Sequence, residues 1–287
     1  MVSMILRIAL SVLLSTACAA AAQETVAFSS VDADLTDGRP TALTGLLFKP
    51  SGDGPFPALV ALHGCSGLYG RRGSLMEREA AWAETFVARG YVVLFPDSFR
   101  PRAVTNGCAD GAPGARPWAE RPRDLYGALL FLQAQPFVIA ERIGLIGWSH
   151  GGGSVVFAIQ TDNTARPAAL PKGDFRAAVA FYPALCNSRH LGITWTTAVP
   201  FLLEVGAADD WTPAQPCVDI VERAIGRGVP IEIKVYPGAY HDFDWPGREL
   251  RTMTPRAGVT VHVGVDAAAR QDALQRVPEF FDRYLKE

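Results

Sequence analysis

The stretch Ile143-Gly144-Leu145-Ile146-Gly147-Trp148-Ser149-His150-Gly151-Gly152-Gly153 decides the fold of this 287-residue chain. Its apolar start, residues 143–146, has the length and composition of a buried strand, and a helical pattern follows over residues 154–160. A Gly-x-Ser-x-Gly motif between a strand and a helix is typical of a nucleophile elbow, which presents a serine hydroxyl above a sheet. We therefore expect Ser149 to be a nucleophile. A glycine-rich turn with a capping serine is the alternative, which the strand-turn-helix context disfavours.

The rest of the chain alternates short apolar runs with helix-like stretches, which predicts a mostly parallel central sheet flanked by helices. Further strands are expected over residues 42–48, 58–62, 91–95, 177–181, 201–205 and 231–236. Further helices are expected over residues 74–89, 123–135, 213–227 and 266–285. Residues 100–120 are rich in Pro, Gly and Arg and predict a long loop, a kind of segment that is often functional. We expect residues 23–287 to form a single domain.

The N-terminus has the composition of an export signal. Residues 1–14 are almost entirely apolar, and the small residues Ala20 and Ala22 match the rule for a cleavage site, so we expect residues 1–22 to be a signal peptide. An uncleaved anchor and lipid attachment at Cys18 are alternatives. The apolar stretch is shorter than the about 20 residues that span a membrane, and no later segment reaches that length. The protein is therefore expected to be periplasmic or secreted, with no membrane attachment after cleavage.

Charge and cysteine content limit the classes of partner, metal and cofactor that we expect. The net charge of −2 gives no sign of a nucleic-acid partner. Four cysteines follow the signal, and an even number in an oxidising compartment favours two disulfides, with three pairings open: Cys65, Cys108, Cys186 and Cys217. Their spacing does not fit a zinc site. We expect neither a metal nor an organic cofactor, and a monomer or homodimer.

A serine nucleophile needs a base to take its proton and an acid to orient that base. In this kind of fold the chain order is serine, acid, histidine. His241 follows the expected strand 231–236, and the other four histidines fit this position less well. The acid should follow the strand 201–205, where Asp209 and Asp210 compete. The spacing from Gly206 favours Asp209.

An oxyanion hole requires two backbone N–H groups near the nucleophile. The residue after the nucleophile, His150, supplies one. The loop after the strand 58–62 begins His63-Gly64-Cys65, and the amide of Cys65 is the expected second donor. His63 itself is expected to brace this loop.

Several stretches, taken in order, resemble the dienelactone hydrolase family. They are Leu62-His63-Gly64-Cys65-Ser66-Gly67, Phe95-Pro96-Asp97-Ser98-Phe99, Gly147-Trp148-Ser149-His150-Gly151-Gly152, Phe181-Tyr182-Pro183, Gly206-Ala207-Ala208-Asp209 and Tyr236-Pro237-Gly238-Ala239-Tyr240-His241-Asp242-Phe243. The resemblance covers roughly residues 40–250 and implies the α/β-hydrolase fold. The namesake enzymes have a cysteine nucleophile, whereas this chain has Ser149, so a general carboxylic-ester hydrolase is expected rather than a true dienelactone hydrolase.

The resemblance carries further expectations. Namesake enzymes hold a substrate carboxylate with an arginine near the end of the fourth strand, a place that Arg100 and Arg102 occupy here, although solvated loop charges are an equal alternative. Neighbouring strands imply the disulfides Cys65–Cys108 and Cys186–Cys217. Trp148 is one of several loop aromatics that either line a substrate pocket or pack.

We expect a serine esterase that cleaves small esters or lactones through an acyl-enzyme. A serine peptidase or acyl-peptide hydrolase on the same fold is one alternative, and a non-catalytic binding protein that retains the fold is another. The sequence does not specify the substrate.

Overall fold

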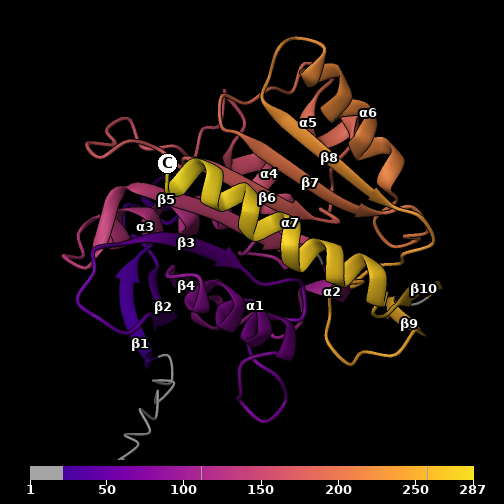
Figure 1. Ribbon diagram of the computed structural model, residues 1–287, viewed down its shortest axis with the longest axis horizontal. Helices are drawn as coiled ribbons and strands as arrows, with labels where there is room; N and C mark the ends of the chain where they lie inside the picture. Colours follow the sequence, from indigo (N-terminus) through magenta and orange to yellow (C-terminus); the bar gives the residue numbers. More distant parts are fainter. Residues whose placement is uncertain (1–21, 111, 257) are drawn as a thin grey trace, which may run out of the picture.

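A twisted eight-stranded sheet forms the centre of the computed structural model, which describes residues 22–110, 112–256 and 258–287 (Figure 1). Its strands are β1 (Ala22–Ser29), β2 (Ala42–Lys49), β3 (Phe56–Leu62), β4 (Val92–Asp97), β5 (Val138–Trp148), β6 (Ala177–Phe181), β7 (Phe201–Gly206) and β8 (Ile231–Tyr236). Their order across the sheet is β1-β2-β4-β3-β5-β6-β7-β8. The mostly parallel sheet expected from the sequence is confirmed.

Strands β3 to β8 pair in parallel, while β1 with β2 and β2 with β4 pair antiparallel. The central strands β3, β4, β6 and β7 are apolar and buried nearly throughout, as expected where helices cover both faces of a parallel sheet. Strand β1 was not expected, because its polar edge residues, such as Gln23 and Glu24, lack the pattern of a buried strand.

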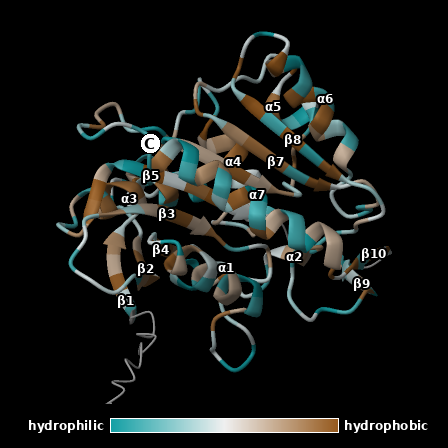
Figure 2. Ribbon diagram, viewed as in Figure 1, coloured by the Kyte–Doolittle hydropathy of each residue, from teal (hydrophilic) through white to brown (hydrophobic). Residues whose placement is uncertain are grey.

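Helices cover the two faces of the sheet. They are α1 (Glu77–Ala88), α2 (Gly107–Asp110), α3 (Glu120–Gln133), α4 (His150–Ala158), α5 (Ser188–Leu191), α6 (Ala214–Ile225) and α7 (Ala267–Leu285), with short 3-10 helices η1 (Ala33–Leu35) and η2 (Arg100–Arg102). Helices α1 and α7 bury residues in one core cluster, and α3, α4 and α6 bury residues in the other. Figure 2 shows hydrophobic residues along the central strands and hydrophilic residues on the outward side of α7.

A small hairpin of β9 (Arg251–Arg256) and β10 (Val259–Val263) lies between the loop after β8 and helix α7. The sequence analysis did not predict these strands. The amide of Gly264 donates to the carbonyl of His241 at 3.0 Å, and the amide of Val265 donates to the carbonyl of Arg248 at 2.7 Å. The hairpin is therefore fixed to the loop that carries His241.

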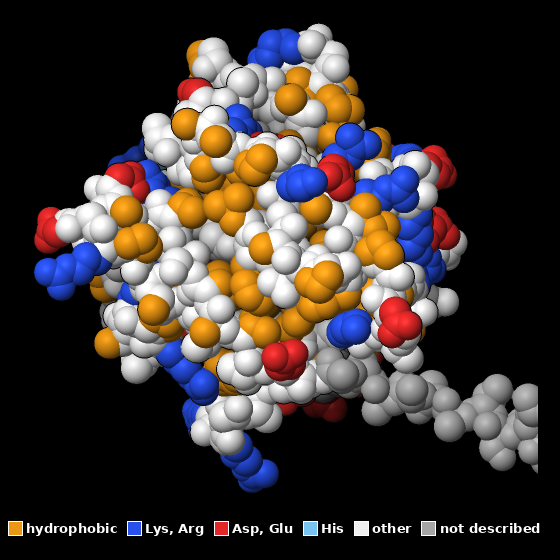
Figure 3. Space-filling model, turned by 90° about the vertical axis from the view of Figure 1, so that its left-hand side faces the viewer, with side chains coloured by type: hydrophobic (Ala, Val, Ile, Leu, Met, Phe, Trp, Pro, Cys, Tyr) orange, Lys and Arg blue, Asp and Glu red, His pale blue; other side chains and the backbone are white. Residues whose placement is uncertain are grey.

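Two disulfides, Cys65–Cys108 and Cys186–Cys217, each join a loop that follows one strand to a helix that follows a neighbouring strand. Disulfides persist in oxidising compartments, which favours an extracellular or periplasmic location. Within the described residues, no helix has the length and apolarity to cross a bilayer. The expected signal peptide falls almost wholly on residues outside the described ranges. On the face drawn in Figure 3, positive and negative side chains are interspersed rather than gathered by sign.

Candidate active site

Ser149 stands in the sharp turn between β5 and α4, with φ 53° and ψ −113°. A positive φ is strained for a residue with a side chain, and such strain is typical of functional turns. The turn is too tight for side chains at its flanking glycines. A Cβ on Gly147 would lie 2.5 Å from the carbonyl oxygen of Gly151, and a Cβ on Gly151 would lie 2.1 Å from the carbonyl oxygen of Leu62. Helix α4 begins directly after Ser149, four residues earlier than the sequence predicted.

His241 and Asp209 form a buried pair beside this turn. Nδ1 of His241 lies 2.7 Å from Oδ2 of Asp209. The other carboxylate oxygen accepts hydrogen bonds from the amides of Trp211 and Thr212 at 2.9 and 2.8 Å. The Thr212 hydroxyl donates to Oδ2 of Asp209 at 2.9 Å and fixes the same oxygen that contacts the ring. Asp209 is thus held in one orientation toward His241.

The other ring nitrogen of His241, Nε2, is buried and has no hydrogen-bond partner among the described residues. His241 and Ser149 both line one small cavity of about 100 Å³. His241 and Ser149 are therefore brought together at one cavity, and the second ring nitrogen of His241 has no other partner there among the described residues.

Asp210 belongs to a different contact. Its Oδ2 lies 2.7 Å from Nδ1 of His262 in β10, and its Oδ1 accepts from the His262 amide at 2.8 Å. Both side chains of this pair are partly exposed. Asp210 therefore anchors the hairpin, and Asp209 is the carboxylate that contacts His241.

The surroundings of His241 set its protonation. Burial lowers the pKa of His241, but the charge of Asp209 and its hydrogen bond outweigh that effect, so the pKa lies above its usual value. The rings of Tyr182 and Trp211 pack on the imidazole, with centroids 4.4 and 4.7 Å away. The arrangement favours an imidazolium that is stabilised by Asp209, which is what a base requires once it has taken a proton.

One expected oxyanion donor, His150, belongs to the elbow, and the other, Cys65, belongs to the loop after β3. His150 is the first residue of α4, where backbone N–H groups and the helix dipole favour negative charge. Cys65 follows β3 and lines the cavity with Ser149. No hydrogen bond from the Cys65 amide is found among the described residues, whereas its carbonyl accepts from the amide of Gly107 at 2.9 Å.

A buried arginine, Arg121 of α3, connects these two donor segments. Its Nη1 donates to Nδ1 of His150 at 2.6 Å, and its Nη2 donates to the carbonyl oxygen of His63 at 2.7 Å. Burial lowers the pKa of Arg121 to about 9, so the side chain stays charged at neutral pH. The sequence analysis missed Arg121, because nothing in the sequence around it indicates contacts with residues 29 and 58 positions away.

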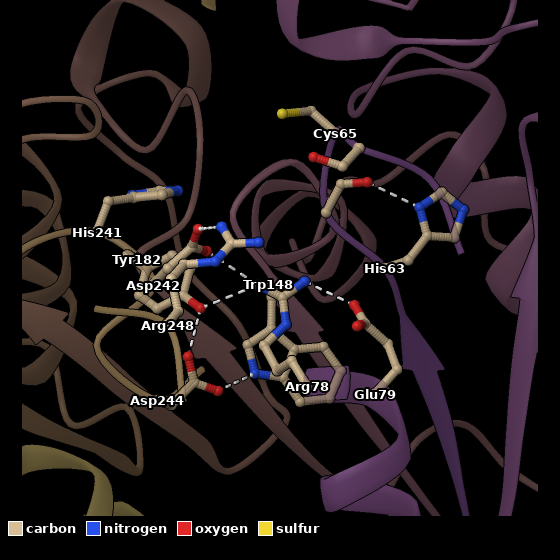
Figure 4. Close-up of polar contacts among 12 residues, drawn as sticks. His63, Cys65, Arg78, Glu79, Trp148, Tyr182, His241, Asp242, Asp244 and Arg248 are labelled. Atoms are coloured by element: carbon tan, nitrogen blue, oxygen red, sulfur yellow. Dashed lines mark hydrogen bonds and ion pairs between the residues drawn. The ribbon is translucent and has the colours of Figure 1, made fainter. Parts of the chain in front are cut away.

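A second buried network lies beneath the elbow (Figure 4). Asp244 accepts hydrogen bonds from the indole N–H of Trp148 at 2.8 Å and from the hydroxyl of Tyr182 at 2.5 Å. Arg78 donates to Tyr182 and to Asp242 at 3.2 and 3.1 Å. Trp148, which the sequence suggested for substrate binding, is fully buried in this network and does not line the cavity. Its role is to support the turn.

The two arginines suggested for a substrate carboxylate are also placed elsewhere. Arg102 is buried and bonds Asp32 and Asp124 at 2.8 Å each, so its guanidinium is already neutralised inside the protein. The Arg100 side chain is 59% exposed and stacks on the ring of Tyr69 at 3.6 Å. Arg100 lines a neighbouring groove but not the cavity of Ser149 and His241. The arginines in the cavity wall are ones that the sequence analysis did not name: Arg78, Arg248 and Arg251.

The sheet order, the strained serine turn and the buried His–Asp pair define a member of the α/β-hydrolase superfamily. The sequence model of the dienelactone hydrolase family matches residues 43–285, and the chain belongs to that family. The family makes the protein a hydrolase with a small-molecule substrate.

Solved structures share this fold at low identity. A dienelactone hydrolase-like promiscuous phosphotriesterase from metagenomic libraries is 19% identical with a TM-score of 0.65, over 92% of this chain and 99% of that one. Esterase 2 of Thermogutta terrifontis, phosphorylated by paraoxon, is 19% identical with a TM-score of 0.61, over 91% and 94%. The acylaminoacyl peptidase of Pyrococcus horikoshii is 19% identical with a TM-score of 0.64, over 93% of this chain but 42% of the peptidase.

Proposed function

We propose that this protein is a serine hydrolase that cleaves carboxylic esters or lactones through an acyl-enzyme, with Ser149, His241 and Asp209 as its catalytic triad. The observation that carries the proposal is the buried 2.7 Å contact between His241 and Asp209, in a cavity that Ser149 also lines and with no hydrogen-bond partner for the second ring nitrogen among the described residues. These residues would supply the nucleophile, the base and the orienting acid that acyl transfer requires.

In the proposed reaction, Nε2 of His241 takes the proton of Ser149 as the hydroxyl oxygen attacks the ester carbonyl. The negative charge on the carbonyl oxygen is stabilised by the amides of Cys65 and His150. His241 then gives its proton to the departing alcohol, and the acyl group stays on Ser149. A water molecule, deprotonated by His241, attacks the acyl-enzyme and releases the acid.

Substitution of the nucleophile tests the proposal. We expect the Ser149→Ala variant to fold normally and to lose hydrolysis of p-nitrophenyl acetate and labelling by a fluorophosphonate probe. Ser188→Ala, which changes an exposed serine at the start of α5, should keep both. Full hydrolysis by a folded Ser149→Ala protein would remove Ser149 from the mechanism. A wild-type protein that neither hydrolyses esters nor reacts with the probe would favour a binding protein that only retains the fold.

We also propose that residues 1–22 are removed during export, because the small-residue pattern at Ala20 and Ala22 precedes two disulfides that need an oxidising compartment. Mass spectrometry of the exported protein should give an N-terminus at Gln23. An intact N-terminus on the mature protein would contradict this.

A further inference from the structure

The catalytic cavity is too small to hold a whole substrate. Its volume is about 100 Å³, whereas pockets that enclose a small-molecule ligand usually measure about 300–1,000 Å³. The cavity has room for the reacting carbonyl and its nearest atoms. The remaining parts of an ester, on the acyl side and on the alcohol side, must extend beyond it.

A groove of about 740 Å³ continues directly from the cavity. The two share four lining residues: Ser66, Gly67, Met76 and Met253. We call this space the side groove. Its walls come from the loop after β3, the segment between β4 and α2, and strand β9. Its lining combines apolar and aromatic residues with polar ones. The apolar and aromatic residues are Leu68, Tyr69, Met76, Phe99, Val104 and Met253, and the polar and charged residues include Arg71, Asp97, Arg100, Thr105, Asn106 and Thr254.

The walls of the side groove are held in place. The Cys65–Cys108 disulfide joins the loop after β3 to the segment after β4, and the amide of Gly107 donates to the carbonyl of Cys65. Arg100 stacks on Tyr69 across the same wall, and the Asp97 carboxylate accepts hydrogen bonds from two backbone amides at 3.1 Å. A preformed groove binds an extended group without the cost of ordering its walls.

The position of the groove indicates which part of the ester it takes. The alcohol must leave beside His241, because His241 supplies its proton. A different groove, of about 560 Å³, shares Trp245, Arg248 and Arg251 with the cavity and is lined by Glu77 and by residues 245–251, which follow His241 in the chain. The side groove instead continues past Ser66 and Gly67 of the loop that carries Cys65 and is bordered by β9 rather than by residues 245–251, which leaves it for the acyl group.

We propose that the side groove binds the acyl part of the substrate, and that the enzyme prefers esters of extended apolar acids, with a chain of several carbons or an arylalkyl group, over acetates. This inference rests on the proposed function. The inference goes beyond the proposed function because it names the acyl group as the part of the substrate that decides specificity and the side groove as the site that binds this group.

A series of p-nitrophenyl esters with acetyl, butyryl and octanoyl groups tests the inference, because the leaving group stays constant while the acyl chain grows. We expect kcat/KM of the wild type to rise from acetate to octanoate by about tenfold or more, since each added methylene group that the groove buries makes binding of the acyl chain more favourable. Octanoate ion should also inhibit acetate hydrolysis competitively.

Blocking the groove provides the critical comparison. Thr105 is exposed, lines the side groove and makes no side-chain hydrogen bond among the described residues. Thr105→Trp should lower kcat/KM for the octanoate at least about tenfold more than kcat/KM for the acetate, whose acyl group is too short to reach the groove. The matched control is Thr164→Trp, which changes an exposed loop threonine outside every cavity named above and should change neither.

Equal rates for all three acyl chains in the wild type would overturn the inference, as would an unchanged octanoate preference in Thr105→Trp. If kcat/KM depends on the alcohol in a series of alkyl acetates and not on the acyl group, the groove binds the alcohol part of the ester. That result would also overturn the inference. Loss of all ester hydrolysis in the wild type is a different result, because it contradicts the proposed function itself.

Discussion

Replacement of Arg121 by methionine tests how the proposed oxyanion hole is held together. The substitution keeps an extended side chain but removes the hydrogen bonds at 2.6 Å to His150 and at 2.7 Å to the carbonyl of His63. A hydrogen bond to a charged group contributes about 1.5–3 kcal/mol. Deletion of one oxyanion donor typically costs about 10²–10³ in kcat. Because Arg121→Met displaces the donors rather than deleting them, we expect kcat to fall by about 10–10².

The assay is steady-state hydrolysis of p-nitrophenyl acetate with separate kcat and KM values. KM should stay nearly constant, because the donors act mainly on charge that develops in the transition state. Affinity for an alkylboronic acid, which forms a tetrahedral adduct with a serine, should fall in parallel with kcat. Arg121→Lys retains a charge and should give an intermediate kcat.

Arg123 of the same helix provides a matched control. It is also buried, but it bonds Asp34 and the carbonyl of Ala119, away from the elbow. Arg123→Met should lower thermal stability and leave kcat close to that of the wild type. The reasoning is refuted if both variants lose kcat equally, or if Arg121→Met raises KM without changing kcat and boronic-acid affinity.

Three further predictions concern charged groups. Activity of the wild type should fall as the pH drops through the raised pKa of His241, because only the neutral ring accepts the serine proton. Asp209→Asn should lower kcat by about 10³–10⁴ and move this acid limb of the pH–rate profile to lower pH. An acid limb that does not move would contradict the assignment of Asp209. Asp210→Asn disrupts a partly exposed pair with His262, so its kcat should change less than about threefold, and a loss as large as that of Asp209→Asn would refute the division of roles. Burial raises the pKa of Glu204 to about 8, so its ionisation opposes folding increasingly from about pH 4.5 to 8. Glu204→Gln should therefore gain thermal stability relative to the wild type as the pH rises across that range, and a constant difference in Tm would count against this.

Local patterns in the sequence predicted the sheet and indicated Ser149 as a candidate nucleophile, because such patterns depend on neighbours in the chain. Seven of the eight strands of the large sheet are predominantly apolar stretches that the sequence analysis expected, and the elbow is a contiguous motif. Spacing in the sequence favoured Asp209 over Asp210, but the roles of the two residues depend on which histidine each carboxylate contacts. Asp210 contacts His262, which lies on a hairpin that the sequence did not predict.

The binding residues were predicted poorly because their contacts are distant in sequence. Arg102 follows a strand end, as a substrate-binding arginine would, but Asp32 and Asp124 lie 70 and 22 residues away and neutralise it. Trp148 adjoins the nucleophile in the chain, yet its indole bonds Asp244, 96 residues later. Periodicity carries no information about such pairings.

The β9–β10 hairpin contacts both the candidate active site and the side groove. Met253 on this hairpin borders the cavity and the groove, and the amide of Gly264, directly after the hairpin, donates to the carbonyl of His241. If the proposed roles are correct, substitutions of groove-facing side chains on β9 change which acids the enzyme accepts, whereas insertions or deletions in the hairpin also displace the proposed base.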